Sequence, residues 1–410
     1  TETTDGADGT ETTDGADGTE TTDGADGTDA TKPNAAMVVV QSDYASTSIS
    51  LVNPDGTLLA DSIIDSGSAT AGVTTALSGD VVVPSLPAGD GSIILIDRTN
   101  GILTRIGATG DYAVKDQIDV STGFYANPHD VWQWEDTLLV TRNETNGAAG
   151  AEDYDGGGDV LLVDAVTGDI TGRIDLNPIA SAGLLPKPSG FAILGGAPWV
   201  NLDHFAGDFS AAGPAAFAKL DPANEAYTDV LVLENVTNCG GLSHIPGGSS
   251  AWVACNGWYA SADQLAESGL IRLTVGEDGA VSADHEATAS TFADSPLGSN
   301  VAALDADRVY VIQPGDSFGT PPTDDQLWLY DAVSGTATKT NVTSGGYNLG
   351  TVLVQNDGKS LFVTDADATE PALLRFTVGE DGGLTALAPV ETDATNFLPP
   401  RALAFLPSPK

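Results

Sequence analysis

Short runs of alternating apolar and polar residues, each ending at a turn rich in Gly, Asn or Asp, recur along the chain. In SIILIDRTNGILTRI, residues 92–106, an apolar run ends at an Asp, a Gly-containing turn follows, and a second run leaves it. Alternation at period two between such turns predicts two antiparallel strands joined as a hairpin. Related stretches begin at Ser48, Val160, Ala216, Leu270, Leu327 and Leu373, which makes seven copies.

Two further predicted strands stand before six of the seven hairpins. In the second repeat they are VTTALSGD, residues 73–80, and DVVVPSL, residues 80–86. The first hairpin follows only one strand, MVVVQSD from Met37, and the missing fourth strand is RALAFLP from Arg401. Small repeats bury their faces only against neighbours, and closing the ring removes open sheet edges. We therefore predict an all-β, seven-bladed β-propeller over residues 35–410, closed by the C-terminal strand pairing into blade one.

The repeats resemble the YVTN-type repeats of seven-bladed β-propellers. The shared pattern is V/L-x-V/L-h-D-x-x-x-G, with h apolar, on the third strand and the turn after it, and the resemblance covers residues 37–407. That family includes surface proteins, binding modules and some enzymes, so it implies a fold and leaves the activity open. The layout, with NPHD leading into one blade and a Cys pair in another, is also similar to secreted propellers of predatory and marine proteobacteria.

Residues 1–34 form a separate, low-complexity extension. TETTDGADG occurs three times in tandem, and residues 1–31 contain ten acids, no base and no apolar residue larger than Ala. Such a segment cannot offset its ordering entropy by burial, which predicts that it is disordered on its own. Its Thr-rich pieces suit addition as strands to a neighbouring sheet edge. We expect this tail to mediate self-association, as in an extracellular filament or matrix, or to bind a surface partner.

The charge balance excludes some classes of partner. The chain has 58 acids and 15 bases, a formal net charge of -43. Nucleic acids and anionic lipid surfaces would be repelled, because their phosphates need bases to neutralise them. The sequence also has no run of 18 apolar residues, so it predicts no membrane span.

The only two cysteines, Cys239 and Cys255, flank a predicted hairpin whose turn is centred on Gly247. Residues directly opposite each other in a hairpin lie within about 4.5–5.5 Å at Cβ, which is near disulfide range. The sequence predicts a disulfide, and the alternative is a pair of buried thiols. A disulfide implies an oxidising compartment. We therefore expect an exported bacterial protein located outside the cell or at its surface.

One face of the predicted ring gathers the loops that lead into innermost strands and those that join second to third strands. The main ligand candidates in these loops are Asn127, His129, Asp130, Arg142, Asn256 and Trp258. The same face is expected to hold Tyr125, Asn143, Asn238, Asn300, Asn348, Asp365 and Asp367. A His with an Asp and several amides suits acid–base chemistry or the binding of a polar ligand. The alternative is that Asn-Pro-His-Asp is a turn bonded to its own backbone.

The loop AEDYDGGGD, residues 151–159, predicts a calcium site. It places carboxylates at Asp153, Asp155 and Asp159 among glycines, which resembles the start of an EF-hand loop. Position twelve of that pattern is Asp164 instead of the usual Glu. The DGADG units of the tail offer paired carboxylates as well. The alternative in both places is a solvated acidic loop.

The chain contains no G-x-S-x-G motif, phosphate-binding loop or dinucleotide fingerprint. We therefore predict an exported structural or interaction protein, with calcium as its cofactor, that is not an enzyme and has no catalytic residues. The alternative is a small-ligand-binding protein or hydrolase that uses the central funnel around His129.

Overall fold

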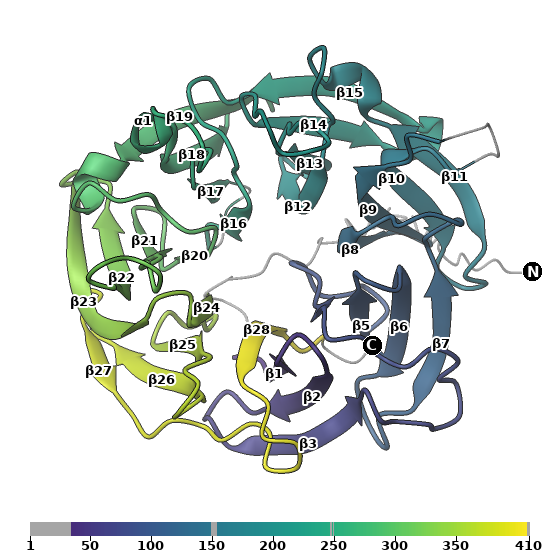
Figure 1. Cartoon of the computed structure of the whole chain (residues 1–410), viewed down its shortest axis with the longest axis horizontal. Coiled ribbons are helices and arrows are strands. Elements are labelled where there is room, and N and C mark those ends of the chain that lie inside the picture. Colours follow the sequence, from purple (N-terminus) through teal and green to yellow (C-terminus); the bar gives the residue numbers. More distant parts are fainter. Residues whose placement is uncertain (1–33, 149–153, 247, 249, 408–410) are drawn as a thin grey trace, which may run out of the picture.

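The computed structural model describes residues 34–148, 154–246, 248 and 250–407. Over this part the chain forms seven four-stranded antiparallel sheets arranged as blades around a central axis (Figure 1). The predicted all-β, seven-bladed propeller is confirmed. The predicted tail lies outside the described residues except for Asn34.

In each of the first four blades, the strands follow one another from the axis outwards. Blade 1 contains β28 (Pro400–Phe405), β1 (Met37–Ser42), β2 (Thr47–Val52) and β3 (Leu58–Asp65). Blade 2 contains β4 (Val81–Val82), β5 (Ser92–Asp97), β6 (Ile102–Gly107) and β7 (Val114–Asp119). Blade 3 contains β8 (Pro128–Trp134), β9 (Thr137–Thr145), β10 (Gly157–Asp164) and β11 (Ile170–Asp175). Blade 4 contains β12 (Pro188–Leu194), β13 (Ala197–Leu202), β14 (Ala216–Asp221) and β15 (Ala226–Val232).

The remaining blades have the same order. Blade 5 contains β16 (Gly241–His244), β17 (Ala251–Cys255), β18 (Gly269–Val275) and β19 (Val281–Thr288). Blade 6 contains β20 (Val301–Ala303), β21 (Arg308–Gln313), β22 (Asp324–Asp331) and β23 (Thr336–Gly345). Blade 7 contains β24 (Leu349–Val354), β25 (Ser360–Asp365), β26 (Ala372–Val378) and β27 (Leu384–Ala386). The helical segments are short: α1 (Gln264–Glu267), η1 (Asn177–Ile179), η2 (Pro222–Asn224) and η3 (Ala289–Phe292).

Blade 2 corrects one prediction. Residues 73–80, expected as a strand, form a loop, and the hairpin of residues 92–106 supplies the second and third strands instead of the third and fourth. The backbone N–H groups of Thr74 and Thr75 bond the Gln117 side chain of β7 at 2.7 and 2.8 Å. These N–H groups thus bond a side chain and not the backbone of a neighbouring strand.

The ring is closed by the last strand, as predicted. β28 pairs antiparallel with β1, so that Met37 lies opposite Phe405 and Val39 opposite Leu403. Just beyond the strands, the backbone N–H of Leu406 donates to the Ala36 carbonyl at 2.7 Å. Closure of this kind leaves β1 paired on both of its edges, by β28 and by β2.

The hydrophobic core lies between neighbouring blades. One cluster joins blades 3 and 4 through Trp132, Leu139, Phe191 and Val200, all at most 6% exposed. The second strand of each blade is covered on both faces by its neighbours, which explains why β1 and β5 are buried along their whole length. Such strands read as continuous apolar runs in the sequence.

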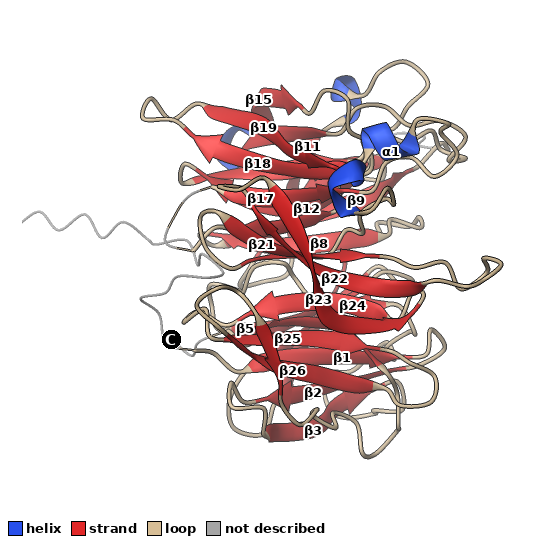
Figure 2. Cartoon of the chain, turned by 90° about the vertical axis from the view of Figure 1, so that its left-hand side faces the viewer, coloured by secondary structure: helices blue, strands red, loops and turns tan. Residues whose placement is uncertain are grey.

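Antiparallel pairing sorts the loops onto two faces of the disc. The loops that lead into innermost strands and those that join second to third strands lie on one side, which we call the front face; α1 marks it in Figure 2. The loops joining first to second and third to fourth strands form the back face. The Asn34 side chain contacts Asp357 of a back-face loop at 3.0 Å. In the described part of the chain no helix is long and apolar enough to cross a membrane.

Cys239 and Cys255 form the predicted disulfide. It links the segment before β16 to the end of β17, inside blade 5. Both residues are at most 1% exposed and pack with apolar residues of blades 4 and 5.

Replacing both cysteines with alanine is expected to lower the free energy of unfolding by about 3 kcal/mol, because the closed loop of 16 residues no longer restricts the unfolded chain. Chemical denaturation of wild type and of the double variant, with and without reductant, measures this. An equal midpoint for oxidised wild type and the double variant would contradict it.

Candidate functional site

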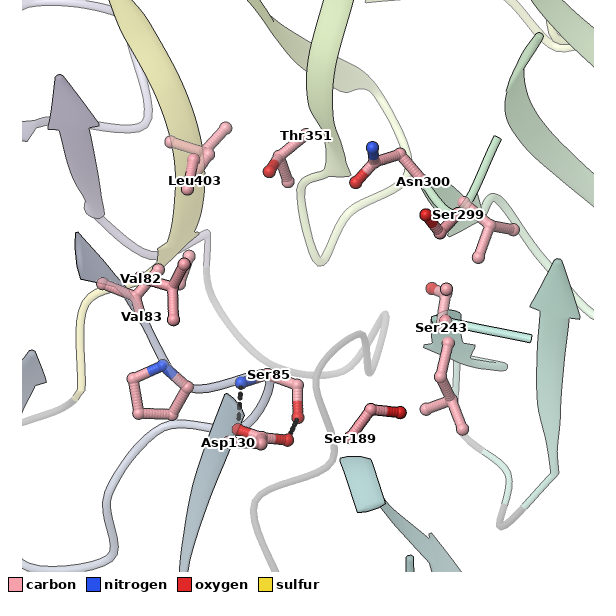
Figure 3. A pocket seen from close by; sticks show the side chains of 18 of the residues that line it. Val82, Val83, Ser85, Asp130, Ser189, Ser243, Ser299, Asn300, Thr351 and Leu403 are labelled. Atoms are coloured by element: carbon pink, nitrogen blue, oxygen red, sulfur yellow. Dashed lines mark hydrogen bonds between the residues drawn. The ribbon is translucent and has the colours of Figure 1, made fainter. Parts of the chain in front are cut away.

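A cavity of about 550 Å³ lies on the propeller axis. Residues of all seven innermost strands, or of the loops beside them, line it. Figure 3 shows Val82, Asp130, Ser189, Ser243, Asn300, Thr351 and Leu403 arranged around this single space. Its size suits a small-molecule ligand.

The cavity lining has both polar and apolar side chains. Innermost strands run from the front face towards the back face, so the first residues of each strand and the loops before it lie near the front. The polar residues His129, Asp130, Ser189, Asn238 and Asn300 come from these positions, and Arg98 and Asp203 come from front-face loops that join second to third strands. Ser85, Ser243 and His244 are polar residues at or beyond the far ends of innermost strands, where Val83, Val354 and Phe405 also lie.

Asp203 follows β13 and is only 8% exposed. Burial raises the pKa of its carboxyl group to about 7, although hydrogen bonds from Asn201, Ser189 and the Cys239 backbone act in the opposite direction. Asn201 donates to Asp203 at 3.0 Å, to Ser189 at 2.8 Å and also to the Cys239 carbonyl. The carboxyl group is thus held by neighbouring blades on the wall of the cavity, and it titrates near neutral pH.

Asp130, 3% exposed, links three blades. Its carboxylate accepts hydrogen bonds from the Ser85 hydroxyl at 2.5 Å, the Ser85 N–H at 3.0 Å, and the N–H groups of Val131 and Phe191, both at 2.8 Å (Figure 3). Burial raises its pKa to about 6 in spite of these bonds. With its acceptor positions used by the scaffold, Asp130 holds blades 2, 3 and 4 in place around the cavity.

His129 is a neutral imidazole at physiological pH. Burial lowers its pKa to about 3, and the positive charges of Arg98 and Lys187 act in the same direction. Both bases are themselves paired: Arg98 Nε lies 2.9 Å from Asp80, and Lys187 Nζ lies 2.6 Å from Glu144. The imidazole therefore offers one hydrogen-bond donor and one acceptor to the cavity.

His244 lines the cavity at the end of β16 and is 5% exposed. Its Nε2 atom accepts the Ile193 N–H at 3.0 Å, which places the ring proton on Nδ1. Burial lowers its pKa to about 4. This histidine joins blades 4 and 5 as a neutral acceptor.

Of the residues predicted for the funnel, the structure brings His129, Asp130, Asn238 and Asn300 together on the cavity wall. Arg142 is fully buried and pairs with Asp159 at 2.7 Å. Asn256 accepts from Gln264 at 3.3 Å, and the backbone N–H of Trp258 bonds Glu267 at 3.3 Å. These three, like the remaining candidates, stand outside the cavity lining: Tyr125, Asn127, Asn143, Asn348, Asp365 and Asp367.

The three predicted calcium ligands, Asp153, Asp155 and Asp159, have different surroundings or lie outside the described residues. Asp153 lies outside the described residues, and Asp155 is partly buried. Asp159 is not free to act as the predicted ligand, because Arg142 and Arg173 bind its carboxylate at 2.7 and 3.2 Å. Within the described ranges no group of three or more His, Cys, Asp or Glu residues is placed to hold a metal ion. Calcium binding stays a prediction that depends on Asp153 and Asp155.

Sequence reasoning missed Arg98, Ser189, Asp203 and His244. A signal existed for Asp203, since the run NLDHF follows a second strand in blade 4 just as TRNET does in blade 3. Arg98 was hidden by the blade 2 error, which placed the turn after Asp97 on the wrong face. Ser189 and His244 lie within innermost strands and carry no motif.

No protein-family model matches the sequence, and no curated protein matches it. Solved structures match the fold. A protein from Lactobacillus plantarum has a TM-score of 0.57 at 12% identity, over 91% of this chain and 100% of that one. A protein from Bacteroides fragilis described as a candidate 6-phosphogluconolactonase has a TM-score of 0.54 at 12% identity, over 91% and 98%. A quinoprotein alcohol dehydrogenase-like protein from Bacteroides thetaiotaomicron has 0.52 at 12%, over 91% and 78%.

These neighbours correct the prediction that the chain is not an enzyme. The same fold carries a protein described as a lactonase and one described as dehydrogenase-like, so the lack of a linear catalytic motif does not exclude catalysis. In a propeller, residues that are far apart in the sequence come together at the axis, so a site built from several blades leaves no linear motif. At 12% identity the likeness extends to the fold alone, and the resemblance to YVTN-type and secreted propellers stays a prediction. The chain is a closed seven-bladed β-propeller with a cavity on its axis that is lined by polar and apolar side chains.

Proposed function

We propose that this protein is an enzyme that binds a small polar molecule in the axial cavity and transfers protons to and from it through Asp203. The observation that carries the proposal is the buried carboxyl group of Asp203, whose pKa is raised to about 7, on the wall of a cavity of about 550 Å³. Titratable groups with strongly shifted pKa values in a concave site are candidates for catalysis.

A pKa near 7 suits a group that must both accept and donate a proton. At neutral pH Asp203 is present as both carboxylate and acid, so it can serve as base in one step and as acid in the next. His129 stays neutral and can bond a substrate without charge, and Asn238 and Asn300 add amide groups. Arg98 is the one Lys or Arg on the described lining, which favours a neutral or singly anionic substrate.

Hydrolysis of a small ester or lactone is a reaction class that these groups can carry out with water alone. The Asp203 carboxylate removes a proton from water as the water oxygen bonds the carbonyl carbon. The carbon–oxygen bond to the alcohol then breaks, and Asp203 returns the proton to the leaving oxygen. The products are a carboxylic acid and an alcohol, which in a lactone remain one molecule.

The test is a hydrolysis screen of small neutral and singly charged lactones and esters, followed by pH titration. Asp203→Asn is expected to lower kcat/KM by at least about 100-fold, and the wild-type rate should depend on a group with a pKa near 7. Asp208→Asn is the matched control, because Asp208 lies in the same loop but is exposed and bonds only Ser210. Equal rates for Asp203→Asn and wild type, or no hydrolysis by wild type across the screen, would contradict the proposal.

The disulfide supports a further part of the proposal, an exported location in an oxidising compartment. Assembly through residues 1–34 stays a separate prediction, since these residues lie almost wholly outside the described chain.

A further inference from the structure

Seven aromatic side chains are strongly exposed in the described part of the chain, and all of them lie in front-face loops. Their exposed fractions range from 43% to 89%. They come from loops of blades all around the ring: Tyr44, Tyr125, Phe209, Tyr259, Phe318, Tyr347 and Phe397. We call this set the aromatic rim.

The back face is different. Its most exposed apolar side chains are two valines in hairpin turns, Val166 at 78% and Val333 at 80%. Single exposed aliphatic residues are ordinary on protein surfaces and need no explanation. Exposed aromatic residues gathered on one face are not ordinary, because aromatic side chains are enriched at the centres of binding surfaces.

Four of the rim residues have a left-handed backbone. The φ angles are 67° at Tyr44, 56° at Phe209, 66° at Tyr347 and 59° at Phe397. This region is unfavourable for a bulky L-residue, and such conformations gather at functional sites. The cost is not offset by burial of the ring, since each of the four is exposed.

Carboxylates accompany the rim. Asp43 precedes Tyr44, Asp208 precedes Phe209, and Asp316 stands two residues before Phe318. Asp263 lies in the loop of Tyr259. The Lys and Arg residues in the described front-face loops are Arg98 and Lys187, and each is already paired with a carboxylate. An aromatic face beside a carboxylate is suited to a cation.

Two rim residues already bind cations of the protein itself. Lys187 Nζ lies 4.8 Å from the centre of the Phe209 ring, and the Arg401 guanidinium lies 4.8 Å from the centre of the Tyr44 ring. Among the described residues the other five rim aromatics have no such cation. These five side chains are 57–89% exposed.

We propose that the front face is a docking surface for a lysine- and arginine-rich polypeptide segment of another protein, held by the aromatic rim and its carboxylates. This goes beyond the enzyme proposal and does not depend on Asp203. The net charge of -43 disfavours acidic occupants, including the acidic repeats of residues 1–31 from a second copy.

The test uses the full chain and a short fluorescein-labelled peptide of alternating lysine and arginine, with a glutamate peptide as the second probe. The variant is Tyr259→Ser/Phe318→Ser/Phe397→Ser, and the matched control is Val166→Ser/Val333→Ser on the back face. By fluorescence anisotropy at physiological salt, the rim variant is expected to raise the Kd of the basic peptide about tenfold or more, and the control less than about twofold.

A protein this acidic attracts any basic peptide weakly, and this experiment separates that effect from docking. If charge alone is responsible, the rim variant binds as tightly as wild type, which overturns the proposal. Equal losses in both variants, binding of the glutamate peptide, or self-association through the rim also overturn it. Should the rim variant fail to fold, hydrogen exchange on wild type decides. The basic peptide must then protect residues 314–323 and 387–399, and no protection there overturns the proposal.

Discussion

Replacing Arg142 with alanine is expected to lower the free energy of unfolding by about 3–5 kcal/mol, because it leaves the carboxylate of Asp159 buried without its main partner. Both side chains are 0% exposed, and the guanidinium contacts the two carboxylate oxygens at 2.8 and 2.7 Å. Arg142 also bonds the Thr122 hydroxyl at 2.6 Å and the Tyr154 carbonyl at 2.7 Å. Denaturant unfolding followed by tryptophan fluorescence measures the loss.

Arg173→Ala is the matched control. Arg173 bonds the same carboxylate at 3.2 Å, but its side chain is 31% exposed, so its loss is expected to cost less than about 1 kcal/mol. If the two single variants unfold at the same denaturant concentration, the buried pair of Arg142 and Asp159 is not the contact that stabilises blade 3.

Asp203→Asn is expected to stabilise the protein at pH 8, by up to about 4 kcal/mol, and to have little effect at pH 4. The folded pKa of Asp203 is raised from 3.8 to about 7, so the folded state holds the proton more tightly than the unfolded state. Wild type therefore loses stability as pH rises from about 4 to 7, while the buried carboxyl group ionises. An asparagine cannot ionise and avoids this loss.

The two cavity histidines, His129 and His244, change stability with pH in the opposite direction. The pKa of His129 is lowered from 6.5 to about 3 and that of His244 to about 4, so their contribution is lost as pH falls below 6.5. Thermal unfolding of wild type and Asp203→Asn at intervals from about pH 4 to 9 separates the effects. A difference in Tm between the two proteins that does not change with pH would show that Asp203 is not the titrating group.

The blades could be predicted because alternation and turn residues are local signals. Blade 2 shows where this ends: its innermost strand is only Val81–Val82, too short to give a period, and its outer strand VKDQID has few apolar residues. The sequence therefore predicted a strand at residues 73–80. In the structure this segment is a loop that bonds the side chain of Gln117.

The candidate site was predictable in part. His129, Asp130, Asn238 and Asn300 were found because loops that lead into innermost strands converge in any propeller. Asp203 becomes distinctive only through its burial, which no local pattern reports. Asp159 was taken as a metal ligand from its spacing in the loop, but β9 and β10 pair so that it lies directly opposite Arg142. The partner of Asp159 is therefore set by the pairing of β9 with β10, and not by the spacing of carboxylates along the loop.

Ring closure has a consequence for the newly made chain. β1 is built from Met37–Ser42, but the strand that covers its inner edge, β28 (Pro400–Phe405), is translated only at the far end of the sequence. Until then Met37–Val40, a run of four apolar residues in a strand without a partner on that side, is a segment of the kind that associates between chains. Blade 1 therefore cannot be completed before residues 400–405 have been made.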